Sequence, residues 1–172
     1  MTLDPRCRPI RLILADVDGV LTDGGIIFDN RGIEIKRFHV RDGMGIKLWQ
    51  KAGYRFGLIT HRSSNIVKMR TAELGIEIIR QGIDNKLTAM RGIIGELQLV
   101  PEQVCYIGDD LPDLPVVQAV GLGVAVADAC TEVRQTAHYV TALPGGSGAV
   151  RETIELILKA QSRWEDLIQA FR

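Results

Sequence analysis

The sequence predicts an α/β fold in which a doubly wound, mostly parallel sheet is covered by helices. Short aliphatic runs alternate along the chain with segments whose apolar residues recur at helical spacing, as in repeated strand–helix units. Hydrophobic residues make up 46% of the sequence and aromatic residues only 5%, which favours an aliphatic core. Several aliphatic runs end in polar residues, at the sheet edge where open α/β proteins place their ligands.

The first aliphatic run, from Ile10 to Leu14, leads into Asp16 and Asp18. A run of this kind, bounded by charge and followed by glycine, predicts a fully buried parallel strand. The two carboxylates at its end repel each other and lose hydration. We therefore expect a cation nearby to offset them.

The next segment differs from its surroundings and predicts a β-hairpin. Ile26–Phe28 and Ile33–Phe38 flank a glycine-containing turn at Asp29–Gly32. The second strand alternates apolar with charged residues, as in a half-exposed ribbon. An isolated hairpin is marginally stable in water, so we expect it to complete its burial against a partner, such as copies of itself in other subunits.

The remaining chain continues the alternation of strands and helices. The expected helices have a capping residue, a terminal glycine or an apolar face, and they span residues 43–52, 64–75, 86–97, 114–120, 131–137 and 149–171. The expected strands are short aliphatic runs at residues 56–60, 76–79, 104–107, 122–126 and 139–140. The sequence contains no internal repeat or linker. We therefore interpret residues 1–172 as a single domain with a hairpin insertion at about 25–39.

Charge and composition exclude several classes of partner. Lys plus Arg equals Asp plus Glu at 21 each, which leaves no field to attract nucleic acid or an anionic membrane. The sequence has no signal-peptide core and no apolar stretch of membrane-spanning length. Cys7, Cys105 and Cys130 lack metal-ligand spacing and are expected as reduced thiols, with Cys105 in a core strand. We expect a soluble, cytoplasmic protein that binds neither nucleic acid nor membrane.

Polar residues follow the expected strands at four places and would converge on one edge of a parallel sheet. They are Asp16 and Asp18; Thr60, His61 and Arg62; Lys86; and Asp109, Asp110 and Asp113. Hydrolysis of a phosphomonoester needs a nucleophile, a cation that holds it beside the phosphate dianion, and an acid for the leaving alcohol. Three oxygen ligands completed by waters suit Mg²⁺.

The order of these residues resembles the four motifs of haloacid dehalogenase-like phosphatases. The matching parts are D-V-D-G-V-L-T-D from Asp16, the strand ending in Thr60, the isolated Lys86, and G-D-D-x-x-D from Gly108. The segments F-H-V-R-D-G-M-G-I-K, Q-G-I-D-N-K, V-A-V-A-D-A and G-G-S-G-A-V-R-E extend the resemblance from Ile10 to about Gln161. They are typical of the small capless subgroup that acts on 3-deoxy-D-manno-octulosonate 8-phosphate. The resemblance implies a Rossmann-like fold without a cap domain and a place in lipopolysaccharide biosynthesis.

The resemblance also implies the roles of the acidic pair. Asp16 would be the nucleophile that forms an aspartyl-phosphate. Asp18 would protonate the leaving sugar hydroxyl and then activate water, the switch required when one group serves both half-reactions. Mg²⁺ would be held by the Asp16 carboxylate, the Asp18 main-chain carbonyl and Asp109.

Four further residues would support the phosphoryl group. By the same resemblance, Thr60 would donate a hydrogen bond to it, and Lys86 would neutralise it together with the nucleophile. Asp110 and Asp113 would orient the metal-bound waters and Lys86.

The resemblance further implies a homotetramer assembled through the hairpin, in which a neighbouring subunit helps to cover each otherwise open site. The substrate pocket would be lined by His39, Val40, Arg41, Asp42, Gly43, Lys47, Arg62 and Arg70. Arginine suits the carboxylate of a sugar acid through its two-pronged donor geometry.

Two residues depart from the subgroup's pattern on the substrate side. His61 stands where the second motif usually has glycine, and Lys47 stands where arginine is expected. A Cβ at position 61 restricts the backbone, and lysine offers a point charge in place of a forked contact. These departures keep a nine-carbon keto-sugar acid 9-phosphate, or a broader range of sugar phosphates, open as the alternative substrate.

Plainer structural interpretations also stand. Asp23 and Asp29 are favoured as turn formers, and Asp42 could be one too. Asp113 could be only a helix N-cap, and Lys86 an ordinary residue at a helix start. The glycine-rich segment 145–148 could cradle phosphate or form a simple turn. His138 and Trp164 are favoured as surface and packing residues.

Two other classes of function compete with the phosphatase. A two-component receiver domain also uses acidic residues, threonine and lysine on a doubly wound sheet. Its acidic pair, however, precedes one central phosphorylated aspartate, and it has no late G-D-D. A catalytically silent oligomerisation domain would keep the hairpin and pocket without turnover.

Overall fold

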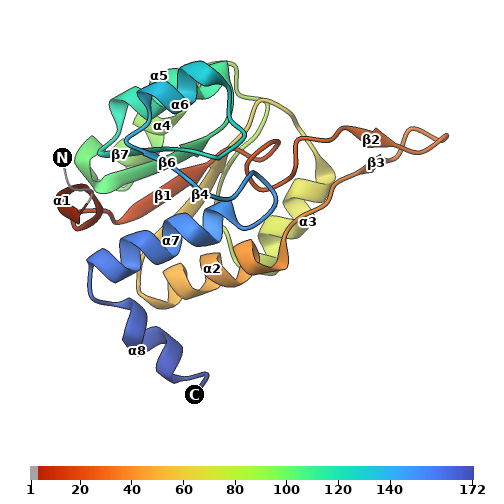
Figure 1. The fold of residues 1–172 in the computed structure, drawn as a ribbon. Helices are drawn as coiled ribbons and strands as arrows, with labels where there is room; N and C mark the ends of the chain where they lie inside the picture. Colours follow the sequence, from red (N-terminus) through yellow and green to blue (C-terminus); the bar gives the residue numbers. More distant parts are fainter. Residues whose placement is uncertain (1–3) are drawn as a thin grey trace.

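The computed structural model describes residues 4–172, which contain a parallel sheet of six strands (Figure 1). The strand order is β5-β4-β1-β6-β7-β8, and every pairing is parallel. Their bounds are β1 Leu12–Ala15, β4 Arg55–Ile59, β5 Ile78–Arg80, β6 Val104–Gly108, β7 Leu122–Ala125 and β8 Tyr139–Val140. The predicted doubly wound α/β fold is confirmed.

Helices cover both faces of this sheet (Figure 1). On one face lie α2 (Val40–Lys51), α3 (Asn65–Leu74) and α7 (Ala149–Ala160). The other face carries α4 (Lys86–Glu96), α5 (Leu114–Ala119) and α6 (Thr131–Thr136). Short elements complete the chain: α1 Asp4–Cys7, α8 Trp164–Gln169, and 3₁₀ turns at Pro101–Gln103 and Leu111–Asp113.

The first strand is the centre of the sheet. All four residues of β1 are fully buried, and the strand pairs with β4 on one side and β6 on the other. The chain builds outward from β1 through β4 to β5, then crosses over and continues with β6 on the opposite side. This reversal is a topological switch point, where open α/β sheets leave a crevice at the carboxyl ends of the strands.

The predicted hairpin is present and projects away from the sheet and its helices (Figure 1). Its strands are β2 (Ile27–Phe28) and β3 (Glu34–Ile35), shorter than expected. In the turn, Asp29 Oδ1 accepts hydrogen bonds from two backbone N–H groups, and Gly32 has a φ of +78°, which favours glycine. Asp29 is thus a turn former, as favoured from the sequence.

The expectation of one helix over residues 149–171 is wrong. α7 ends at Ala160, Ser162 adopts a left-handed backbone with φ +55°, and α8 begins at Trp164. Trp164 explains the turn, because its buried ring lies 5.0 Å from the Arg151 guanidinium and 5.5 Å from Lys159 Nζ. These contacts lie on α7, so α8 folds back where a straight helix would extend into solvent.

Other helices and strands differ from the expected bounds by smaller amounts. α2 begins at Val40, before the expected Gly43, because His39 Nδ1 accepts a hydrogen bond from the Arg41 backbone and caps the helix. All three cysteines are free, and Cys105 is fully buried in β6. Within residues 4–172, none of the helices has the length and apolar character to span a bilayer.

The packing of Trp164 gives a stability prediction. We expect Trp164→Ala to lower the free energy of unfolding by about 3 kcal/mol, because it removes a large buried ring and leaves α8 without its main anchor. Urea unfolding followed by far-UV circular dichroism measures the change. Phe171→Ala, at a residue that is 64% exposed, is the control. A Trp164→Ala loss no larger than that of the control would contradict this account of α8.

Candidate active site

Four of the predicted polar positions meet at the carboxyl ends of the central strands. Asp16 follows β1, Thr60 follows β4 and Asp109 follows β6, while Lys86 opens α4. Because β1 lies between β4 and β6, the residues that follow these three strands are neighbours. Thr60 is 2% exposed, so its hydroxyl lies inside the fold.

Lys86 joins two of the aspartates. Its ammonium lies 2.7 Å from Asp16 Oδ2 and 2.7 Å from Asp113 Oδ1, and its side chain is 2% exposed. Burial alone would lower the pKa of Lys86, but the charges of Asp16 and Asp113 raise it above its usual value. Lys86 therefore keeps its positive charge and holds it beside Asp16. This disfavours the alternative that Lys86 is an ordinary residue at a helix start.

Asp113 organises the acidic turn that follows β6. Its Oδ1 accepts hydrogen bonds from Lys86 and from the Tyr106 hydroxyl at 2.7 Å. Its Oδ2 accepts from the backbone N–H groups of Asp109 and Asp110. A Cβ at Gly108 would clash with Asp113, so this position requires glycine. The Asp113 side chain makes no capping hydrogen bond to α5. Its observed contacts are those with Lys86, Tyr106 and the turn after β6, which disfavours the alternative of a simple helix N-cap.

Asp109 is the residue whose bonding is incomplete. Its Oδ1 is buried and has no hydrogen-bond partner among the described residues. Oxygens of Asp16, Asp109 and Asp113 lie within 4.8 Å of one another, in a geometry that could hold a metal ion. Each Asp113 oxygen already accepts two hydrogen bonds, whereas each Asp16 oxygen has one such partner and Asp109 Oδ1 has none among the described residues, so Asp16 and Asp109 have the free capacity for a cation.

The raised pKa values of this cluster also favour a cation beside it. Burial first, and then the charge of Asp113, raise the pKa of Asp16 to about 6, although Lys86 lowers it. Burial and the charges of Asp113 and Asp16 raise the pKa of Asp109 to about 8. Buried carboxylates this close need a cation to remain ionised at neutral pH. The donor set therefore fits a hard divalent ion such as Mg²⁺.

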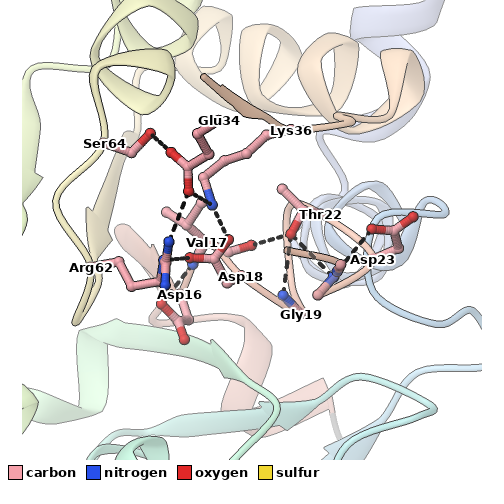
Figure 2. Close-up of polar contacts among 12 residues, drawn as sticks. Asp16, Val17, Asp18, Gly19, Thr22, Asp23, Glu34, Lys36, Arg62 and Ser64 are labelled. Carbon is pink, nitrogen blue, oxygen red and sulfur yellow. Dashed lines mark hydrogen bonds and ion pairs between the residues drawn. The ribbon is translucent and has the colours of Figure 1, made fainter. Parts of the chain in front are cut away.

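The D-V-D-G-V-L-T-D loop has a compact backbone (Figure 2). Asp16 Oδ1 accepts a hydrogen bond from the Val17 N–H at 2.7 Å, and Thr22 Oγ1 accepts from the N–H groups of Gly19 and Gly24. A Cβ at Gly19 would overlap the Asp109 carboxylate, so this loop lies directly against Asp109. That closeness supports the predicted use of the Asp18 carbonyl as a third ligand, which stays a prediction.

The glycine-rich segment packs onto the back of this loop. A Cβ on Gly145 would overlap the Gly19 carbonyl, and the Gly146 N–H donates to the Val20 carbonyl at 2.9 Å. Two successive glycines are needed here for the close approach of two backbones. This contact favours the structural alternative for residues 145–148.

The Asp18 carboxylate is held by cations from two other elements (Figure 2). Lys36, just beyond β3, forms an ion pair with Asp18 Oδ1, and Arg62 Nε lies 3.8 Å from Asp18 Oδ2. Glu34 lies behind both cations, 3.3 Å from Lys36 Nζ and 3.0 Å from an Arg62 nitrogen. Ser64, the residue before α3, donates a hydrogen bond from its Oγ to Glu34 at 2.6 Å. The start of α3 is therefore linked to the hairpin.

Sequence reasoning missed Tyr106, Lys36 and Glu34. The hairpin carried a signal, because its charged residues alternate with isoleucines and therefore share one face. What the alternation could not tell is that the charged face turns inward. Tyr106 looked like one more apolar residue of a core strand, and its hydroxyl partner is visible only in three dimensions.

The predicted substrate residues are distributed more widely. His39, Val40 and Arg41 lie at the start of α2, and Lys47 is exposed further along the same helix. Asp42 is 1% exposed and accepts a hydrogen bond from the Arg151 backbone at the start of α7.

Two other predicted substrate residues lie together. A Cβ at Gly43 would contact a guanidinium nitrogen of Arg70, and Arg70 also lies 5.8 Å from the Phe38 ring centroid and pairs with Glu73. Arg62, another member of the predicted substrate set, lies 3.8 Å from a catalytic candidate, Asp18. Asp23 binds the Gly25 N–H and pairs with Arg37, as expected for a turn former.

Comparison with known proteins gives a consistent picture. Residues 58–151 match the model of the haloacid dehalogenase-like hydrolase family. A 3-deoxy-D-manno-octulosonate 8-phosphate phosphatase from Yersinia pestis is 48% identical over 93% of this chain and 86% of its own length.

Solved structures are equally similar. A probable phosphatase from Pseudomonas syringae shares 48% identity with a TM-score of 0.97, covering 98% of this chain and 96% of that one. The 3-deoxy-D-manno-octulosonate 8-phosphate phosphatase of Moraxella catarrhalis, in complex with a magnesium ion, a phosphate ion and a KDO molecule, shares 44% identity with a TM-score of 0.97. That match covers 99% of this chain and 98% of the other.

The raised carboxyl pKa values predict how metal binding depends on pH. In the metal-free protein Asp16 and Asp109 keep protons that the unfolded chain has already released. Stability therefore falls as the pH rises through about 6 and about 8. A bound divalent ion removes this loss. We expect the rise in melting temperature on adding Mg²⁺ to be larger at pH 8 than at pH 6 in thermal unfolding scans.

Asp109→Asn sharpens this test. It should raise the melting temperature of the metal-free protein at pH 8 and remove most of the Mg²⁺-induced shift. Asp166→Asn, at an exposed residue of α8, should behave as the wild type. A Mg²⁺ shift that survives Asp109→Asn would show that the ion binds elsewhere.

Proposed function

The chain belongs to the haloacid dehalogenase-like hydrolase family, and we propose that it hydrolyses 3-deoxy-D-manno-octulosonate 8-phosphate to the free sugar acid and phosphate. It is a phosphomonoesterase, as its curated relatives are. The observation that carries the proposal is the Asp16 carboxylate, which is bound by the buried Lys86 ammonium and lies close to Asp109, whose Oδ1 has no hydrogen-bond partner among the described residues. The activity fits a role in lipopolysaccharide biosynthesis, and residues 1–172 are proposed to act as one domain with the hairpin as an insertion.

The first half-reaction transfers the phosphoryl group to Asp16. A carboxylate oxygen of Asp16 attacks phosphorus, and the bond from phosphorus to the sugar oxygen breaks with its electron pair on that oxygen. Asp18 gives its proton to the leaving oxygen. Lys86 holds its charge between nucleophile and phosphoryl group, and the buried Thr60 hydroxyl donates a hydrogen bond to the transferring oxygens. Fixed charges and donors of this kind act strongly in a site with little water.

The second half-reaction restores the enzyme. Asp18, now a carboxylate, takes a proton from water, and the water oxygen attacks phosphorus. The bond from phosphorus to Asp16 breaks, and phosphate leaves. One residue thus acts first as acid and then as base, and the sum of the two steps is hydrolysis of one phosphate ester.

The cofactor is Mg²⁺, which the Moraxella relative also contains. The Asp16 and Asp109 carboxylates would hold it together with the Asp18 carbonyl, and Asp110 and Asp113 would orient its waters. When bound, the ion supplies positive charge to the phosphate oxygens and to the acidic cluster. Asp113 contributes by fixing Lys86 and the Asp109 backbone.

The substrate class rests on the relative that binds KDO and on Arg62, whose guanidinium lies beside Asp18. Arg62 and Arg70, with Lys47 and the segment His39–Gly43, are proposed to recognise the sugar acid. A nine-carbon keto-sugar acid 9-phosphate is the alternative, because Lys47 and His61 are both exposed and depart from the subgroup's pattern. His61 Nε2 lies 3.6 Å from Asp84 Oδ1.

The hairpin supports a homotetramer. It carries a cluster of apolar residues, each of which is between 46% and 56% exposed: Ile26, Ile27, Phe28, Ile33 and Ile35. Five exposed apolar residues on a two-stranded ribbon are unfavourable in a lone subunit and favour contact with another protein surface. Copies of the same hairpin supply a self-complementary partner, and a neighbouring subunit would cover each open site.

The nucleophile can be tested directly. We expect Asp16→Asn to reduce kcat on 3-deoxy-D-manno-octulosonate 8-phosphate by roughly a thousandfold or more, because an amide does not attack phosphorus. Phosphate release is measured with and without Mg²⁺. A nine-carbon acid 9-phosphate and simple sugar phosphates are tested as alternative substrates. Asp166→Asn is the control. Mg²⁺-dependent turnover that persists in Asp16→Asn would contradict the mechanism, and a preference for the nine-carbon acid would favour the alternative substrate.

The assembly has its own test. We expect Ile33→Asp to split the tetramer, because it places a charge in the apolar face of the hairpin. Analytical ultracentrifugation gives the particle mass, and Val100→Asp, at an exposed apolar residue outside the hairpin, is the matched control. If Ile33→Asp and the wild type have the same mass, the hairpin is not the interface.

A further inference from the structure

We propose that Lys36, which the hairpin carries, is a positioning residue for the acid–base Asp18, so that the projecting hairpin forms part of the active site. The inference rests on the proposed function, since it concerns how Asp18 is oriented in the phosphatase reaction. It assigns to the hairpin a catalytic contribution besides its proposed place in assembly.

The burial of Lys36 is the first observation. Its side chain is only 1% exposed although it lies next to the exposed strand β3. Removing an ammonium from water is costly unless carboxylates pair with it. Lys36 has two such partners, Asp18 Oδ1 and Glu34 Oε1. The chain therefore directs this lysine inward onto the catalytic loop.

The second observation is that the opposite face of β3 is apolar and exposed. Ile33 and Ile35 are 56% and 48% exposed, whereas Glu34 and Lys36 lie against the domain. Alternate residues of a strand point to opposite faces. The inward face of the hairpin thus consists of charged groups that contact the active site (Figure 2).

Glu34 ties the arrangement to the rest of the domain. It accepts hydrogen bonds from Arg62 at 3.0 Å and from Ser64 at 2.6 Å, and it lies 3.3 Å from Lys36 Nζ. Arg62 and Ser64 belong to the segment between β4 and α3, which has no part in the hairpin. The base of the hairpin is therefore anchored, and Lys36 has a defined position.

The consequence concerns the orientation of Asp18. One of its oxygens is bound by Lys36, and the other lies near Arg62. A general acid must come within hydrogen-bond reach of the oxygen that it protonates, so its side-chain orientation limits the rate. Lys36 sets that orientation through its contact with the Asp18 side chain and so acts through Asp18.

Leaving-group dependence distinguishes positioning from other effects. The kcat/KM of this two-step reaction reports on events up to departure of the alcohol. A sugar or ethyl oxygen needs a proton to leave, whereas the p-nitrophenolate of an aryl phosphate does not. We expect Lys36→Met to lower kcat/KM for both the sugar acid phosphate and ethyl phosphate by about tenfold to a hundredfold, with little change for p-nitrophenyl phosphate.

Matched variants complete the test. Lys36→Arg keeps the positive charge and should restore most of the loss, and Glu34→Gln should show the same pattern as Lys36→Met with a smaller amplitude. Arg37→Met, at the next residue, which pairs with Asp23 on the exposed side, should leave all three substrates unchanged. Thermal unfolding and particle mass establish that each variant is folded and assembled. If Lys36→Met does not fold, Lys36→Arg and Glu34→Gln carry the comparison.

Three results would overturn the proposal. An equal loss on all three substrates would assign Lys36 a purely structural part. A loss on the sugar acid phosphate alone would make it a substrate-binding residue, and no loss at all would exclude any contribution. Failure of the phosphatase function is distinguishable, because the wild type itself would then show no Mg²⁺-dependent turnover of any of the three esters.

Discussion

The interaction on which the proposed active site depends is the buried contact of Lys86 with Asp16 and Asp113. Three carboxylates gather at the end of the central strands, and one lysine reaches two of them at 2.7 Å. Without this ammonium, the burial of so many negative charges would be strongly unfavourable. The pKa of Asp109 is nevertheless raised, by burial first and then by the charges of Asp113 and Asp16. The close carboxylate oxygens and the Asp109 Oδ1 that has no partner among the described residues make the site suitable for a divalent ion.

The sheet topology explains why these groups meet. Asp16, Thr60 and Asp109 come from parts of the chain far apart in sequence, yet each follows one of three adjacent parallel strands. Strand β1 is fully buried, so its carboxyl end is rigidly placed. Glycines at 19, 108 and 145 then permit the backbone of one loop to approach the side chains or backbone of another. Position and close approach together produce a compact site from short loops.

Much of this could be predicted from the sequence, because it depends on local pattern. The aliphatic run before Asp16, the polar residues at the strand ends and the hairpin turn at Asp29–Gly32 are all local signals, and the structure confirms the elements that they indicate. The break at Ser162 was not predictable in this way, because the apolar spacing continues through it and the cause is Trp164 packing back onto α7. The contacts of Tyr106 and Lys36 likewise depend on which face of a strand meets which neighbour.

The hairpin register has a consequence for how this protein can change. Residues 33 and 35 are exposed on the face proposed for assembly, whereas residues 34 and 36 lie on the face that contacts Asp18 and its neighbours. Because side chains alternate with a period of two, a shift of one residue would exchange the two faces completely. The short turn held by Asp29 is therefore intolerant of single-residue insertion or deletion, although exposed turns usually accept such changes. Changes in the length of the hairpin would therefore be confined to insertions or deletions of two residues.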